Sequence, residues 1–112
     1  MRSSEDFALA MRQGSRAGTT SVVVHLALPD NPPGQQALVG FVVSKAVGGA
    51  VVRNRVKRRL RAMLAARVGD LPSGSLVVVR ALPASAGLSF EQLERDVSSA
   101  LARAGRRRAV SA

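Results

Sequence analysis

Three stretches of the chain have the apolar, β-branched character of strands. Residues 22–28 are rich in valine and are followed at residues 29–34 by a run of proline, asparagine and glycine that predicts a turn. Residues 37–43 form a second predicted strand, and we expect these two strands to pair as an antiparallel hairpin with a long loop. Residues 76–80 are a continuous apolar run, which is typical of a strand buried on both faces.

Helical spacing of apolar residues predicts three helices around these strands. The first covers residues 1–14. The second follows a pair of glycines and continues to about Val68. The third is capped by Ser89, with Gln92 completing a capping box, and it ends at Gly105.

The remaining segments are predicted to be connectors. Residues 15–21 are a polar connector, residues 83–87 are a loop, and residues 106–112 are a short basic tail that we expect to be mobile. The element order αββαβα predicts one α/β (α+β) domain over residues 1–112. Its architecture is a two-layer sandwich, with helices packed on a small central sheet.

Charge is the first indication of function. The chain has 112 residues, a net charge of +10 and a sequence pI of about 11.9. Such values in a compact domain are typical of proteins that bind polyanions, most often nucleic acid. Cysteine is absent and histidine occurs once, which excludes disulfides and thiolate or multi-histidine metal sites. With no apolar run of roughly 18 residues and no signal-peptide pattern, we expect a soluble cytoplasmic domain.

The positive charge is concentrated in the second predicted helix. Residues 45–67 contain eight lysines and arginines and no acidic residue. On a helix, one side is lined by the apolar residues Val52, Val56, Leu60, Met63 and Leu64. The candidate RNA-binding residues around them are Arg53, Asn54, Arg55, Lys57, Arg58, Arg59 and Arg61. The pattern predicts that one side docks on the sheet while the other meets phosphates; a solvated charged face is the alternative.

Several other features have two interpretations. Asn54 is either a nucleic-acid contact or an ordinary N-cap. Gly48 and Gly49 either give room for a partner's backbone or form a plain turn. His25, in mid-strand, is expected to be a face residue rather than a catalytic one. No pair of carboxylates is placed for acid–base catalysis, so we expect no catalytic residue and no cofactor or metal bound by the protein alone.

At the basic helix the sequence resembles a known family. Residues 42–45 (VVSK), followed by residues 50–61 (AVVRNRVKRRLR), resemble the RNR signature of the bacterial ribonuclease P protein component. Residues 4–7, 75–83 and 90–101 resemble the family's first helix, last strand and closing helix, so the resemblance covers nearly the whole chain. It implies a left-handed crossover near the basic helix, where the general rule favours a right-handed one.

The resemblance also implies a function. The family's protein binds a large catalytic RNA, and the two together act as an endoribonuclease that removes the 5′ leader of precursor tRNA. The RNA carries the active site and the Mg²⁺ ions, and the RNR helix faces that RNA. A central cleft holds the single-stranded leader, and the positions that fall on it are Phe7, Met11, His25 and Lys45. The free protein is expected to be monomeric.

The sequence also leaves two other classes of protein to consider. Met11 and His25 stand where the family often has aromatic residues, which weakens the expected stacking on bases. A ribosomal or general structured-RNA-binding scaffold protein has the same composition. A membrane-surface protein fits less well, because docking on the sheet already explains the apolar residues of the basic helix. No membrane partner is therefore expected.

Overall fold

The computed structural model describes residues 15–27, 37–71 and 74–111. The predicted first helix and the turn at residues 29–34 lie outside these ranges, as do Phe7 and Met11. In chain order the elements are β1 (Ser15–Gly18), β2 (Val22–Ala27), β3 (Leu38–Val43), α2 (Ala50–Ala65), the 3-10 helix η1 (Val68–Asp70), β4 (Leu76–Ala81), the 3-10 helix η2 (Pro83–Gly87) and α3 (Phe90–Ser111). The three predicted strands and the two later helices are confirmed.

The four strands form one sheet in the order β1-β2-β4-β3. β2 runs antiparallel to β4, and β3 runs parallel to β4. The predicted hairpin between β2 and β3 is therefore wrong, because β4 lies between them. Every residue of β4 except Arg80 is buried, and so apolar a strand is most stable at the centre of the sheet, where it pairs with a strand on each side.

Strand β1 was not predicted, because its residues 15–18 belong to a segment expected to be a polar connector. It pairs antiparallel with β2 along its whole length. Serine, alanine and glycine give it little intrinsic strand preference. Instead, α3 holds it in place. The Ser15 hydroxyl donates to the carbonyl of Ala104 at 2.7 Å, and the Arg103 guanidinium donates to the carbonyl of Gly18 at 2.7 Å.

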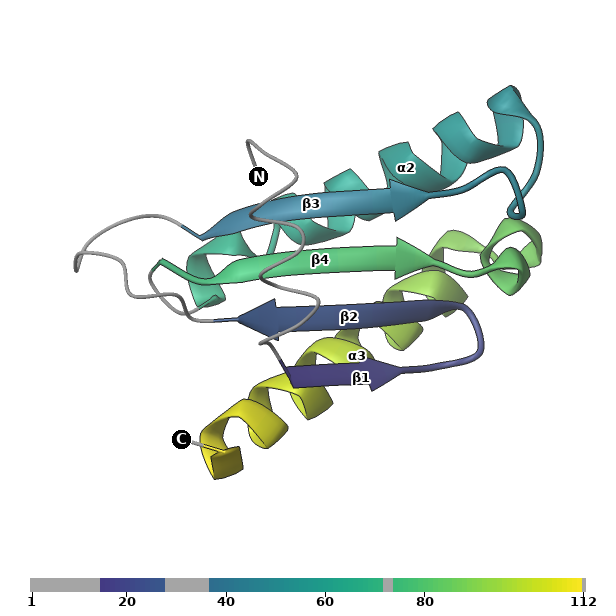
Figure 1. The fold of residues 1–112 in the computed structure, drawn as a ribbon. Helices are drawn as coiled ribbons and strands as arrows, with labels where there is room; N and C mark the ends of the chain where they lie inside the picture. The colour runs from purple at the N-terminus through teal and green to yellow at the C-terminus, as the bar shows by residue number, and fades with distance from the viewer. Residues whose placement is uncertain (1–14, 28–36, 72–73, 112) are drawn as a thin grey trace.

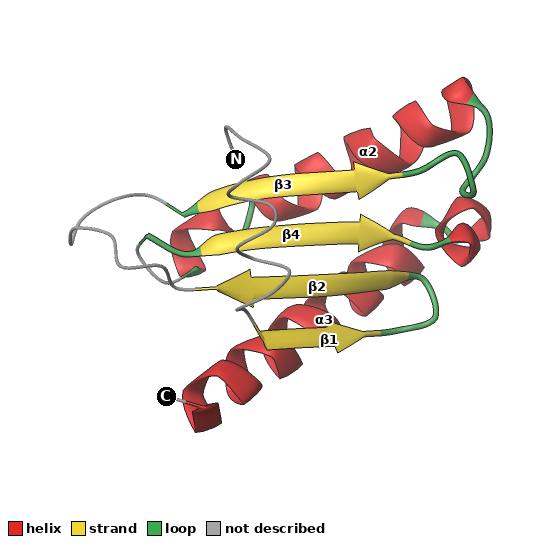
Figure 2. Ribbon diagram, viewed as in Figure 1, coloured by secondary structure: helices red, strands yellow, loops and turns green. Residues whose placement is uncertain are grey.

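Helices α2 and α3 cover the same face of the sheet, which gives the molecule two layers (Figure 1, Figure 2). Because side chains alternate along a strand, every second residue points into the space between the layers. The buried strand residues there include Val22, Val24, Leu26, Val77 and Val79. The helices contribute Val56, Leu60, Leu93 and Val97. Each such side chain stabilises the fold by about 1.5–3 kcal/mol relative to its exposed state.

The connection from β3 through α2 to β4 is left-handed. In Figure 1 the two parallel strands point to the right, β4 lies below β3, and α2 returns behind them. This is the hand that the family resemblance implies and that βαβ units rarely adopt. α2 consequently lies over β3, at one edge of the sheet, where it contacts β3, η2 and α3 and leaves its outer side uncovered by the described residues.

The ends of α3 test two predictions. At its start, the Ser89 amide donates to the Gln92 side chain at 3.0 Å and the Gln92 amide donates to the Ser89 hydroxyl at 3.2 Å, so the capping box is confirmed. At its end, the helix continues through Gly105 to Ser111, so the predicted end at Gly105 is wrong. Gly105 does not have a positive φ. A helical glycine without a left-handed cap weakens a helix by roughly 1 kcal/mol but does not end it.

Candidate nucleic-acid interface

Helix α2 has one buried side and one exposed side, as its sequence predicts. Val56, Leu60, Met63 and Leu64 are buried, and Val52 packs at their margin. Among the predicted RNA-binding residues, those on the exposed side are Asn54, Arg58 and Arg61. The half-buried ones, on the two flanks, are Arg53, Arg55, Lys57 and Arg59. The seven residues therefore form one outer group and two flanking groups.

The loop before α2 is explained by contacts within the chain. The helix begins at Ala50 with Gly49 as its N-cap, so Asn54 lies in the second turn and is not an N-cap. At Gly48, φ is +157°, and a Cβ would lie 3.0 Å from two side-chain carbons of Val52. The close approach at Gly48 is thus internal to the chain, and a partner's backbone is not needed to account for it.

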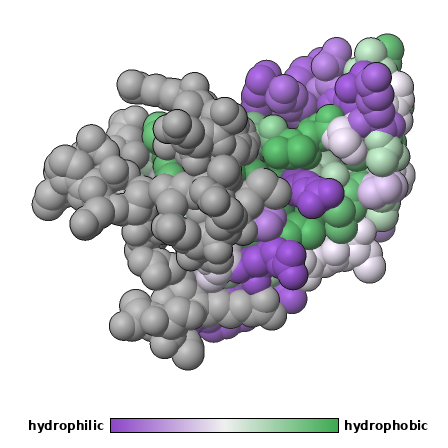
Figure 3. Space-filling model, in the orientation of Figure 1, coloured by the Kyte–Doolittle hydropathy of each residue, from purple (hydrophilic) through white to green (hydrophobic). Residues whose placement is uncertain are grey.

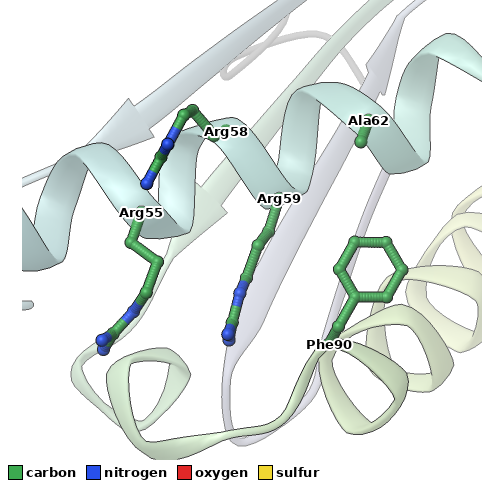
Figure 4. Close-up of a pocket in the computed structure, with 5 residues that line it drawn as sticks. All are labelled: Arg55, Arg58, Arg59, Ala62 and Phe90. Carbon is green, nitrogen blue, oxygen red and sulfur yellow. The ribbon is translucent and has the colours of Figure 1, made fainter.

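Two of the predicted RNA-binding arginines hold a neighbouring loop. Arg55 donates from Nη2 to the carbonyl of Ala86 at 3.1 Å, and Arg59 donates from Nη1 to the carbonyl of Leu88 at 2.9 Å. Both carbonyls belong to the segment that joins β4 to α3. A guanidinium has five donor hydrogens, so each arginine keeps donors for a further partner. Figure 4 shows both side chains extended from α2 toward this segment.

Arg58 separates two open depressions on the surface of α2. One, of about 400 Å³, is lined by Arg55, Arg58, Arg59, Ala62 and Phe90. The other, of about 430 Å³, is lined by Val51, Asn54, Lys57, Arg58 and Arg61. The side chains of Arg58 and Arg61 make no hydrogen bond or ion pair with another described residue. Arg58 is therefore placed to reach a partner that enters either depression.

The electrostatics of α2 favour an anionic partner. The helix has no acidic residue in its first turn and no side-chain N-cap, so its first amides and the helix dipole add to the positive charge. The i,i+4 pairs Arg55–Arg59 and Lys57–Arg61 each cost a few tenths of a kcal/mol in an isolated helix. Phosphate groups over this surface would remove that repulsion.

The sheet face away from the helices carries a second group of cationic side chains. His25 points to this face, because its neighbours Val24 and Leu26 point into the core. Arg16 is its partner across β1, and Arg80 of β4 lies on the same face. Only 4% of His25 is exposed, and neither ring nitrogen has a hydrogen-bond partner among the described residues. Burial, and then the charges of Arg16 and Arg80, lower the pKa of His25 below its usual 6.5.

The predicted leader-binding residues are not all brought together. Phe7 and Met11 lie outside the described residues. Lys45 is exposed in the turn after β3, whereas His25 lies level with Gly40, two strands away. At about 3.3 Å per residue and about 4.8 Å between strands, His25 and Lys45 are on the order of 15–20 Å apart. Figure 3 shows this face, where hydrophobic surface lies between hydrophilic patches.

Sequence reasoning missed three residues that the fold places beside the predicted ones. Arg16 and Arg80 join His25 only through the strand pairing. Alternation along residues 76–80 puts Arg80 on one face, but which strand it would meet depends on the strand order, which was predicted wrongly. Phe90 meets Arg55 and Arg59 only because α3 starts beside α2, and no local signal in the sequence shows this.

The fold and these surfaces define a class: a small two-layer α/β protein that presents a basic helix to a polyanion. Comparison with known proteins agrees. A family model described as ribonuclease P matches residues 1–105. The ribonuclease P protein component of Beutenbergia cavernae is 59% identical over 110 residues, which cover 98% of this chain and 91% of that protein. The one from Streptomyces bikiniensis is 55% identical over 109 residues, which cover 92% and 89%.

Solved structures agree with the fold. The Staphylococcus aureus RNase P protein, 22% identical, superposes with a TM-score of 0.82 over 93% of each chain. The Thermotoga maritima RNase P protein, also 22% identical, gives 0.75 over 88% of this chain and 91% of that one. The chain belongs to the ribonuclease P protein family, which the family model and the close relatives establish. Among the described residues, no helix has the length and apolar character needed to cross a membrane.

Proposed function

We propose that this chain binds the catalytic RNA of ribonuclease P through the outer side of α2 and thereby assists removal of the 5′ leader from precursor tRNA. The observation that carries the proposal is the exposed, purely positive surface that Arg58 and Arg61 form beside Asn54 on α2 in a member of this family. Arginine forks bind phosphate oxygens in pairs, which suits a folded RNA backbone.

The protein's contribution to catalysis is electrostatic. Lys57, Arg58 and Arg61 neutralise phosphates that would otherwise need metal ions, so the ribonucleoprotein works at a lower Mg²⁺ concentration than the RNA alone. The Mg²⁺ ions themselves belong to the RNA in this proposal. In the described ranges, no three histidine or carboxylate side chains are grouped to hold a metal ion, and the α2 surface carries cations rather than ligands for one.

The sheet face away from the helices is the proposed contact for the leader. Arg16 and Arg80 supply charge for the phosphates, and the hydrophobic surface on this face (Figure 3) suits bases of any sequence. Phe7 and Met11, which the family resemblance assigns to the leader-binding cleft, are proposed to contact the leader as well, and Lys45 extends the surface beyond β3. Tolerance of sequence is required, since one protein must accept the leaders of many precursors.

The free protein is also proposed to be monomeric. Two binding measurements test the proposed function. The first compares Kd for a bacterial ribonuclease P RNA with Kd for unrelated structured RNAs at equal salt. Selectivity for the former supports the proposal, whereas equal affinity indicates a general RNA scaffold. The second compares holoenzyme affinity for precursor tRNA with that for mature tRNA. Arg80→Ala should weaken only the precursor complex, while Arg95→Ala, an exposed arginine on α3, serves as the matched control.

A further inference from the structure

The depression between α2 and the start of α3 combines three arginines with one aromatic side chain. Phe90 is half-buried and lines this depression with Arg55, Arg58 and Arg59. Figure 4 shows its ring rising from the first turn of α3 toward α2, beside the extended Arg59 side chain. Phe90 also packs against the hydrophobic core, so one part of its surface serves the fold while the part that lines the depression is available to a partner.

We infer that this depression is a nucleotide subsite, in which one unstacked nucleotide of the partner RNA places its base against Phe90 and its phosphate on Arg58. The inference rests on the proposed function, because it deepens the contact with the catalytic RNA. Every nucleobase has a π-face that stacks on an aromatic ring, and arginine binds phosphate and stacks as well.

The walls of the subsite are held in place before RNA binds. The hydrogen bonds from Arg55 to the Ala86 carbonyl and from Arg59 to the Leu88 carbonyl fix both guanidinium groups at its edge. The capping box at Ser89 and Gln92 fixes the first turn of α3, which carries Phe90. Groups that are already ordered lose less conformational entropy on binding. Arg58 has no protein partner among the described residues, so its guanidinium is available to the phosphate.

Ala62 gives the depression its room. It is exposed on α2 and lines the depression together with Arg58 and Phe90, and Figure 4 shows it above the Phe90 ring. A larger side chain there would occupy the space of the base without removing any charge. Ala62→Leu is therefore a test that is independent of Phe90, and leucine preserves the helix.

The first experiment measures Kd for a bacterial ribonuclease P RNA at fixed salt, with melting temperature as the folding check. Phe90→Leu keeps apolar volume and removes the ring, so we expect at least about a 5-fold loss of affinity. Phe90→Tyr should retain affinity. Ala62→Leu should lose a similar factor, and Ala102→Leu, on the exposed surface of α3, should lose none. Equal affinities for Phe90→Leu, Ala62→Leu and the wild type would overturn the inference.

The second experiment tests base stacking at position 90 directly, and it remains informative if Phe90→Leu folds poorly. The chain has no tryptophan or tyrosine, so Phe90→Trp creates a single fluorophore. Stacking on a base should quench its emission when the RNA binds, while Phe41→Trp, on the core side of β3, should change little. RNA binding without quenching at position 90 contradicts the inference. A wild-type protein that does not select ribonuclease P RNA contradicts the proposed function instead.

Discussion

The outer side of α2 and the sheet face away from the helices both present arginines, but their surroundings differ. On α2, Arg58 and Arg61 are exposed and have no protein partner among the described residues. On the sheet, Arg16 and Arg80 flank His25, which is almost fully buried and has no hydrogen-bond partner among the described residues. The outer side of α2 therefore carries permanent charge, while the sheet face also carries His25, whose charge depends on its surroundings.

The two surfaces should therefore respond differently to salt and to pH. Arginine stays protonated at all relevant pH values, so RNA binding by α2 should depend on salt and not on pH. Binding at the sheet face should depend on both, because an anion beside His25 would favour its charged form. The following predictions separate the two surfaces.

The largest effect is expected from removing charge on the outer side of α2. In the double variant Arg58→Ala/Arg61→Ala, the slope of log K against log salt for ribonuclease P RNA should become shallower by about 2 units, since each phosphate contact contributes about 0.9. The free energy of unfolding should change by less than about 0.5 kcal/mol, as for other exposed positions. An unchanged slope in a salt titration would remove both residues from the interface.

A smaller effect is expected on the flank of the same helix. Arg59→Ala breaks the hydrogen bond to the Leu88 carbonyl and should lower the free energy of unfolding by about 1–2 kcal/mol, the value for a partly solvated bond from a charged donor. Urea denaturation measures this, with Arg58→Ala, its sequence neighbour, as the control. If the two variants are equally stable, Arg59 does not hold the loop.

These neighbours also show what sequence can and cannot predict. The amphipathic period of α2 and the apolar run of β4 were sufficient to predict a docked basic helix and a buried strand, because both depend on residues close in the chain. Arg59 holds the Leu88 carbonyl while Arg58 stays without a protein partner among the described residues, and this difference depends on where the segment before α3 lies. The order of the strands depends on which strand is most stable at the centre of the sheet. Neither is encoded locally, and the same holds for β1.

The smallest effect is expected at the sheet face. Because folding lowers the pKa of His25 below 6.5, the folded protein binds fewer protons than the unfolded chain in the window below that value. The free energy of unfolding should therefore fall as the pH drops below about 6.5 and stay level above it. His25→Gln should flatten this dependence between pH 5.5 and 7.5. As the chain has one histidine, a residual slope in the variant would assign the effect to another group.

The most direct test of the account is reconstitution at a Mg²⁺ concentration where ribonuclease P RNA alone is nearly inactive. Release of the 5′ leader from precursor tRNA is followed with the RNA alone, with the wild-type protein, and with Arg58→Ala/Arg61→Ala. We expect cleavage only when RNA and wild-type protein are both present, weak rescue by the double variant at low Mg²⁺, and recovery of the variant as Mg²⁺ rises. Rescue by the double variant equal to wild type, or no rescue by the wild-type protein, would contradict it.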